Sequence, residues 1–185
     1  MTRGSLITVV VVVSCFISGI FLSDYIRSKQ YPEKISPAAQ TSLQDLSGEP
    51  SPDFSLMDVS GQLRNVSEWK GKVLAINFWA TWCPPCLEEI PHFIKLQDKY
   101  GHQGLQFLGI ALEGVDEVSE FASEIGINYP LLVGEQEVIK LGGKFGNHMG
   151  GLPYTVILDR NGHINFIKMG PLSASEAEQV ITSLL

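Results

Sequence analysis

The chain has 185 residues and a net charge of −7, and 44% of its residues are hydrophobic. That length provides one domain of ordinary size with an appendage, and the apolar content argues against disorder for most of the chain. The acidic balance argues against nucleic-acid binding. Three cysteines are too few for a disulfide scaffold, and only Cys83 and Cys86 form a Cys-x-x-Cys, which excludes a zinc site built from two such pairs.

Residues 4–23 contain no charged residue and are predicted to cross a membrane. A helix of 20 residues is about 30 Å long, the thickness of the hydrocarbon core of a bilayer. We therefore expect residues 1–28 to form a single uncleaved membrane anchor. A cleaved signal peptide and a lipoprotein are alternatives. Residues 12–15 resemble a lipobox ending in Cys15, but the apolar run continues to Leu22, whereas a lipidated cysteine is normally followed by polar chain.

The composition changes after the predicted anchor. Prolines recur among serine, glutamine and alanine residues in residues 29–50, which predicts a tether with little regular structure. The folded domain is then expected to cover residues 51–185.

The first half of this domain begins with a predicted hairpin, because two alternating stretches flank Ser60 and Gly61. Ser67 is expected to cap a short turn after it. A continuous apolar run over residues 72–80 predicts a strand that is buried on both faces. A helix should follow over residues 84–100 and end at Gly101.

In the second half, strands and helices continue to alternate, and Ser173 with Glu176 is expected to form a capping box for the last helix. The order predicts an α/β fold, a three-layer α/β/α sandwich on a mixed central sheet with an N-terminal β-hairpin extension. The expected strands are 105–112, 130–133, 154–158 and 163–169, and the expected helices are 115–125 and 135–145.

Cys83 and Cys86 follow a buried strand and open a helix. The backbone N–H groups and the dipole at a helix start stabilise a thiolate, so we expect Cys83 to be an exposed nucleophile. Cys86, about one turn later, should be the buried thiol that resolves a mixed disulfide. A half zinc site, a structural disulfide and two unrelated core cysteines are alternatives. The four histidines have no recognisable ligand spacing, and a loop of three residues closes too little chain to stabilise a fold. Redox chemistry of a Cys83–Cys86 disulfide, without metal or cofactor, is favoured.

The run NFWATWCPPCLEEIP, residues 77–91, resembles the TlpA/ResA-like membrane-anchored thioredoxins of bacteria, relatives of the cytochrome c maturation reductases. The resemblance extends from about Pro52 to the C-terminus and implies a thioredoxin fold. Residues 151–155 resemble the cis-proline loop of this family, which implies a cis peptide bond before Pro153, beside the cysteines. The resemblance also implies an extracytoplasmic enzyme that reduces disulfides of client proteins with electrons from a membrane thiol reductase.

Acid–base residues are expected from the same resemblance. Thioredoxins carry a buried aspartate where this chain has Asn77, and an amide cannot take the proton of Cys86. Glu113 resembles an acidic residue of the anchored family and is a candidate for the acid; a solvated loop carboxylate is the alternative. Glu89 also matches a family position, but we expect it on the helix surface.

Other residues near the motif have less certain roles. Trp79 and Trp82 either shelter the site or pack in the core, and His148 is interpreted as a loop residue rather than a client contact. Two other functions are alternatives. A thiol peroxidase usually has Thr-x-x-Cys, whereas Thr81 is two residues from Cys83. A Sco-type copper chaperone uses Cys-x-x-x-Cys, one residue longer than the motif here.

The two residues after Cys83 are Pro84 and Pro85, and neither has an N–H group to donate to a thiolate. The thiolate should therefore be less stable than in a strong oxidant, which predicts a reductant. We expect a monomer on the outer face of the bacterial cytoplasmic membrane. Its client, for which apocytochrome c and copper-delivery proteins are examples, is not identified by the sequence.

Overall fold

The computed structural model describes residues 46–185. The expected anchor, Cys15 and all but the end of the expected tether lie outside these residues. Within residues 46–185, the longest apolar helices fall short of what a membrane span requires.

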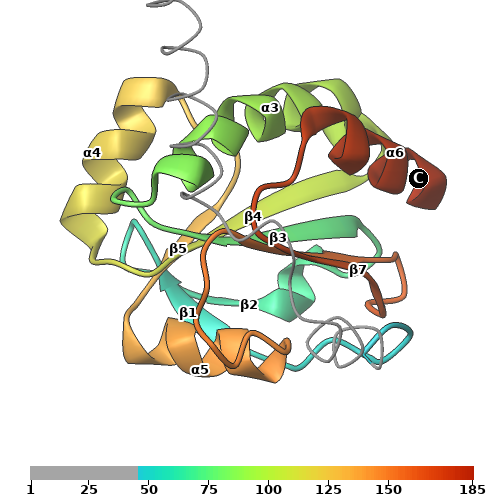
Figure 1. Ribbon diagram of the computed structural model, residues 1–185, viewed down its shortest axis with the longest axis horizontal. Coiled ribbons are helices and arrows are strands. Elements are labelled where there is room, and N and C mark those ends of the chain that lie inside the picture. Colours follow the sequence, from blue (N-terminus) through green and yellow to red (C-terminus); the bar gives the residue numbers. More distant parts are fainter. Residues whose placement is uncertain (1–45) are drawn as a thin grey trace, which may run out of the picture. The chain divides into compact units, whose positions relative to one another are not determined.

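Seven strands form one sheet in the order β2-β1-β5-β4-β3-β6-β7 (Figure 1). The pairs β3–β4 and β4–β5 are parallel, and the other neighbours are antiparallel. The predicted mixed sheet and the N-terminal hairpin, β1–β2, are thus confirmed. The strands are β1 Ser55–Asp58, β2 Leu63–Asn65, β3 Val73–Trp79, β4 Leu105–Ala111, β5 Leu131–Val133, β6 Tyr154–Leu158 and β7 Ile164–Met169.

Helices cover both faces of the sheet, with α3, α4 and α6 on one side and α5 on the other (Figure 1). This arrangement confirms the predicted three-layer sandwich. The helical elements are η1 Val66–Trp69, α3 Pro84–Tyr100, η2 Gly101–Gln103, α4 Val115–Ile125, α5 Gln136–Lys144 and α6 Ala174–Leu184.

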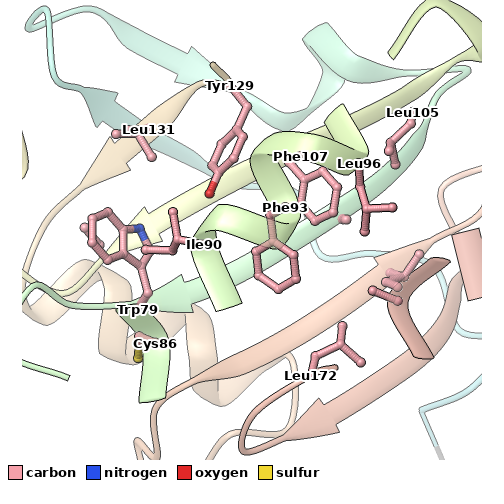
Figure 2. Close-up of a cluster of buried hydrophobic side chains, with 14 of the residues drawn as sticks. Trp79, Cys86, Ile90, Phe93, Leu96, Leu105, Phe107, Tyr129, Leu131 and Leu172 are labelled. Atoms are coloured by element: carbon pink, nitrogen blue, oxygen red, sulfur yellow. The ribbon is translucent and has the colours of Figure 1, made fainter. Parts of the chain in front are cut away.

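Strand β3 lies between two hydrophobic cores, and all seven of its residues are buried. The core under α3 includes Ile90 and a stacked pair, Phe93 and Phe107, whose ring centroids are 4.8 Å apart (Figure 2). Side chains of β3 alternate between the two cores because successive residues of a strand point to opposite faces. The C-terminal end of β3, which leads to Cys83, is therefore held from both sides.

Two predicted helix caps differ from the structure. The turn η1 is capped by Asn65 rather than Ser67: the Asn65 side chain accepts from Ser67 N, and Glu68 accepts from Asn65 N. The Asn65 side chain reaches forward to Ser67 N, and the Glu68 carboxylate reaches back to Asn65 N, so the cap lies two residues earlier than predicted.

At the start of α6 only half of the expected capping box forms. Ser173 Oγ accepts from Glu176 N at 3.3 Å, as predicted. The Glu176 carboxylate is paired instead with Lys168 Nζ at 2.9 and 3.0 Å. An ammonium is a stronger partner for a carboxylate than a neutral N–H group.

The chain enters the sheet at the hairpin between β6 and β7. Gly48 N donates to Ile164 O at 2.7 Å, and Ser51 N donates to Gly162 O at 2.9 Å. The last residues of the expected tether are therefore hydrogen-bonded to the domain. Because β6 runs antiparallel to β3, this hairpin lies at the end of the sheet opposite the cysteines.

Candidate active site

A disulfide joins Cys83 and Cys86 at the start of α3, with their Cα atoms 5.3 Å apart. Cys83 is the N-cap residue of the helix, and its carbonyl oxygen accepts from Cys86 N at 3.0 Å and from Leu87 N at 3.2 Å. The motif therefore forms the first turn of α3, as the sequence predicts. One helical turn is the separation at which two cysteines can close such a bond.

The burial of the two sulfurs is only partly as expected. Cys86 is 0% exposed and Cys83 is 5% exposed, so both cysteines are buried in the disulfide form. The expectation of an exposed Cys83 is wrong for this form, because the bond to Cys86 holds its sulfur against the first turn of α3. The order of exposure agrees with Cys83 as the sulfur that meets a partner.

Pro84 and Pro85 occupy the first two positions of α3. Two backbone donors that a helix start ordinarily offers are therefore missing beside Cys83. The next N–H, of Cys86, donates to the Cys83 carbonyl oxygen. Pro84 and Pro85 thus occupy the positions assumed when the sequence was used to predict a weakly stabilised Cys83 thiolate.

Glu89 corrects an expectation: it lies in the interior, 3% exposed, and not on the surface of α3. Its Oε1 accepts from Asn77 Nδ2 at 2.7 Å, and its Oε2 accepts from Leu172 N at 2.9 Å. Residues three apart share a helix face, so Glu89 lies one turn beyond Cys86 on the face toward the sheet. The spacing Cys86, Ile90 and Phe93 marks this buried face and could have identified Glu89 as part of it.

Burial raises the pKa of Glu89 to about 7, although the hydrogen bonds from Leu172 N and the Asn77 amide lower it. A carboxyl group with this pKa takes up and releases a proton near neutral pH. Since Glu89 is one turn from Cys86, it is suited to exchange a proton with that thiol.

Asn77 connects this acid to the sheet. The buried Asn77 amide donates through Nδ2 to Glu89 Oε1 and also to Thr155 Oγ1, at 3.0 Å, on the neighbouring strand β6. The position that carries the acid in thioredoxins here carries a hydrogen-bond donor to an acid. The carboxyl group comes instead from α3.

Glu113 lies just beyond the end of β4 and is half-buried. Its Oε2 accepts from Thr81 N at 2.6 Å, and its Oε1 accepts from Thr81 Oγ1 at 2.7 Å. The carboxylate therefore binds the loop that leads from β3 to Cys83, two residues before the cysteine. These contacts give Glu113 a structural task at the site; its part in proton transfer stays a prediction.

The peptide bond between Leu152 and Pro153 is cis, which is the isomer implied by the resemblance. Pro153 is buried and immediately precedes β6, whose first residue Tyr154 is in register with Phe78 of β3. Pro153 is therefore at the same end of the sheet as the loop to Cys83. A contact of Pro153 with a client stays a prediction.

Sequence reasoning missed Asn147, a buried residue six positions before Pro153. Its Nδ2 donates to Gly151 O at 2.9 Å, and its Oδ1 accepts from Gly151 N at 3.0 Å. This role could have been predicted from the sequence, since the side chain of an asparagine in a glycine-rich loop often forms hydrogen bonds with the backbone of that loop. His148, next in sequence, is an exposed loop residue, as expected.

The two tryptophans have different environments. Trp79 is buried in the core, with its ring centroid 5.6 Å from that of Phe121. Trp82, adjacent to Cys83, is 62% exposed. Trp79 is therefore a packing residue, and Trp82 presents an apolar surface beside the disulfide.

In the part of the chain that the structure describes, no three His, Cys, Asp or Glu side chains gather as a metal site would require.

Comparisons with known proteins agree with this geometry. The profile of the AhpC/TSA family matches residues 47–167. The thiol-disulfide oxidoreductase ResA of Geobacillus kaustophilus is 31% identical over 138 residues, which cover 74% of this chain and 77% of ResA. The thioredoxin-like protein YneN of Bacillus subtilis is 34% identical over 136 residues, or 71% of this chain and 76% of YneN.

A solved structure is similar in fold as well as in sequence. The thiol:disulfide interchange protein of Chlorobium tepidum, a thioredoxin family protein, superposes with a TM-score of 0.67 at 31% identity. The match covers 73% of this chain and 94% of that protein. Together with the disulfide at the start of α3, these relatives favour thiol–disulfide exchange over the peroxidase and copper-chaperone alternatives. The chain belongs to the AhpC/TSA family and, with its thioredoxin-like fold and Cys83–Cys86 disulfide, is a thiol–disulfide oxidoreductase of the ResA/TlpA type.

Proposed function

We propose that this enzyme is anchored in the bacterial cytoplasmic membrane, faces the extracytoplasmic space and reduces disulfides of client proteins. The observation that carries the proposal is the Cys83–Cys86 pair above a buried Glu89 whose pKa is about 7, with two prolines in place of N–H donors. This combination supplies a nucleophile, a resolving thiol and a proton acceptor without strong stabilisation of the reduced form.

In the reduced enzyme, the Cys83 thiolate attacks one sulfur of the client disulfide. The client S–S bond breaks, a mixed disulfide with Cys83 forms, and the other client sulfur leaves as a thiolate. Glu89 takes the proton of Cys86, whose thiolate then attacks Cys83 Sγ and releases the second client sulfur. Two electrons have passed from the dithiol to the client, and the product is the Cys83–Cys86 disulfide seen in the structure.

The location and partners rest on the sequence. The uncharged residues 4–23 and the proline-interrupted residues 29–50 support an anchor and a tether. Stable protein disulfides persist in oxidising compartments, which supports an extracytoplasmic location for a dithiol that acts on them. A membrane thiol reductase would return the electrons. Apocytochrome c and a copper-delivery protein are the client classes that we propose, and we expect the enzyme to act as a monomer.

Trapping of mixed disulfides in cells tests this function. Full-length Cys86→Ala, in a Cys15→Ala background, should accumulate adducts with extracytoplasmic proteins that dithiothreitol releases, because the resolving thiol is missing. Cys83→Ala in the same background is the matched control and should form none. Equal adducts in both variants, or adducts with cytoplasmic proteins alone, would contradict the proposal.

A further inference from the structure

The segment that joins α5 to β6 has a buried base and an exposed tip. Residues 147–151, named here the 147–151 loop, begin at Asn147, which is 4% exposed. Two residues later, Met149 is 88% exposed and carries the most exposed large apolar side chain in the described chain. A large apolar side chain in this position is in contact with solvent unless a partner covers it.

The Asn147 side chain closes the loop. It donates to Gly151 O and accepts from Gly151 N, which are the two bonds that a neighbouring strand would make to that residue. Asn147 N donates to Gly142 O of α5 at 2.8 Å. An amide side chain supplies both a donor and an acceptor. The loop is therefore held to α5 through the backbone of Asn147 and to Gly151 through its side chain.

The loop leads directly to the reactive end of the sheet. Leu152 follows it and packs against both hydrophobic cores, one of which contains Cys83 and Cys86. The next residue, Pro153, lies at the end of the sheet where β3 turns toward the disulfide. The 147–151 loop therefore leads into the end of the sheet at which the chain turns toward Cys83.

We infer that Asn147 is a positioning residue for client docking: its carboxamide holds the 147–151 loop so that Met149 contacts the polypeptide segment that carries the client disulfide. The inference rests on the proposed reduction of protein clients. Formation of a mixed disulfide requires the client backbone to lie beside Cys83, next to the exposed Trp82 and at the end of the sheet into which the loop leads. Apolar residues flanking the client cysteine suit Trp82 and Met149, since Met adapts its unbranched thioether to irregular apolar surfaces.

Two chromogenic substrates test the inference on the reduced full-length protein. Both carry a cysteine as a mixed disulfide with thionitrobenzoate; one is the free amino acid, and the other is a nonapeptide with leucines on either side of the cysteine. Attack of Cys83 on the cysteine sulfur breaks the S–S bond and releases thionitrobenzoate, which is measured by absorbance. The wild type should react faster with the peptide than with the amino acid.

Asn147→Ala removes both bonds to Gly151 and should lower the rate with the peptide about tenfold, while the rate with the amino acid changes less than twofold. Asn147→Asp keeps the acceptor and loses the donor, so its loss should be smaller. Met149→Ser leaves the loop fastened and tests the contact without risk to folding. Asn165→Ala, which replaces an exposed asparagine of β7, is the matched control and should change neither rate.

Equal losses with both substrates in the three loop variants would overturn the inference, because a docking role affects only the peptide. A wild type without preference for the peptide would also overturn it. A wild type that reacts with neither substrate would instead contradict the proposed function itself.

Discussion

In the proposed reaction, Glu89 accepts the proton of Cys86, and Asn77 holds Glu89 from the strand position at which thioredoxins carry a buried aspartate. The amide of β3 holds the carboxyl group of α3 through a hydrogen bond of 2.7 Å, and Leu172 N holds its other oxygen. Both contacts favour the ionised form, yet burial dominates and the pKa is about 7. Both protonation states of Glu89 are therefore populated near neutral pH.

The stability of the oxidised protein should depend on this group. Because the folded state binds the Glu89 proton more tightly than the unfolded state, its contribution is present at low pH and is lost as pH rises toward 7. Between pH 5 and pH 8 the wild type should lose at most about 3 kcal/mol of unfolding free energy more than Glu89→Gln. Urea denaturation of both proteins at the two pH values measures this, and parallel pH dependences would show that Glu89 titrates normally.

The spacing of Cys86, Ile90 and Phe93 indicates the helix face on which Glu89 lies, but the partners that satisfy a buried carboxyl group could not be predicted from the helix. Glu88 and Glu89 are adjacent in an amphipathic helix, and only Glu88 is exposed. The partners that satisfy the buried carboxyl come from Asn77, on a strand before the helix, and from Leu172, 83 residues later. Such non-local contacts have no signature in the helix itself, whereas Cys83 and Cys86 were found from their spacing and from the strand and helix around them.

At the scale of elements, the start of α3 determines the difference between the two cysteines. Cys83 caps the helix and has 5% of its surface exposed, whereas Cys86 lies inside the first turn with none. Thr81, two residues earlier, is fixed by two bonds to Glu113 from the end of β4. The loop that carries Cys83 is thus held by the helix that follows it and by Glu113, just beyond the end of β4.

This arrangement predicts unequal thiol reactivity. In the reduced full-length protein, Cys83 should be alkylated at least tenfold faster than Cys86, since a thiolate at a helix N-terminus is stabilised and the inner thiol is shielded. Brief exposure to iodoacetamide followed by peptide mass spectrometry resolves the two sites and Cys15. Equal labelling of Cys83 and Cys86 would refute the assigned roles.

Two helix ends were predicted correctly, but only one of them is set by a left-handed glycine. The helix at 115–125 ends at Gly126, which has a φ of 71°. At Gly101, whose dihedrals are right-handed, α3 passes into the 3-10 turn η2, and the left-handed glycine is Gly104. The cap of η1 was predicted less well, because Asn65 and Ser67 are both short polar residues that can take this position. At α6, Ser173 caps the helix as predicted, but the expected reciprocal contact of Glu176 does not form. Here a bond to a charged neighbour, such as that between Glu176 and Lys168, decides the outcome.

At the scale of the whole described domain, the two ends of the sheet have different tasks. The chain joins the β6–β7 hairpin through Gly48 and Ser51, whereas the disulfide follows the opposite end of β3. Seven residues of strand separate these ends by about 20 Å. The point at which the chain enters the domain and the disulfide are therefore at opposite ends of the sheet. If the preceding residues form the proposed anchor, the disulfide lies at the end away from the point where the anchor joins.

The sequence predicted alternating elements but not the strand order, because the placement of β1 beside β5 depends on contacts across the sheet.

The direction of electron flow is the central claim, and the reduction potential of the Cys83–Cys86 pair tests it most directly. Pro84 and Pro85 remove two donors from the neighbourhood of the thiolate, so the reduced form is less stabilised than in a strong oxidant. Equilibration of the full-length protein in glutathione or dithiothreitol buffers, read by the fraction of oxidised Cys83–Cys86 peptide, gives the value. We predict a potential nearer that of thioredoxin, about −270 mV, than that of DsbA, about −120 mV. A potential above about −180 mV, the region of protein disulfide isomerase, would contradict it.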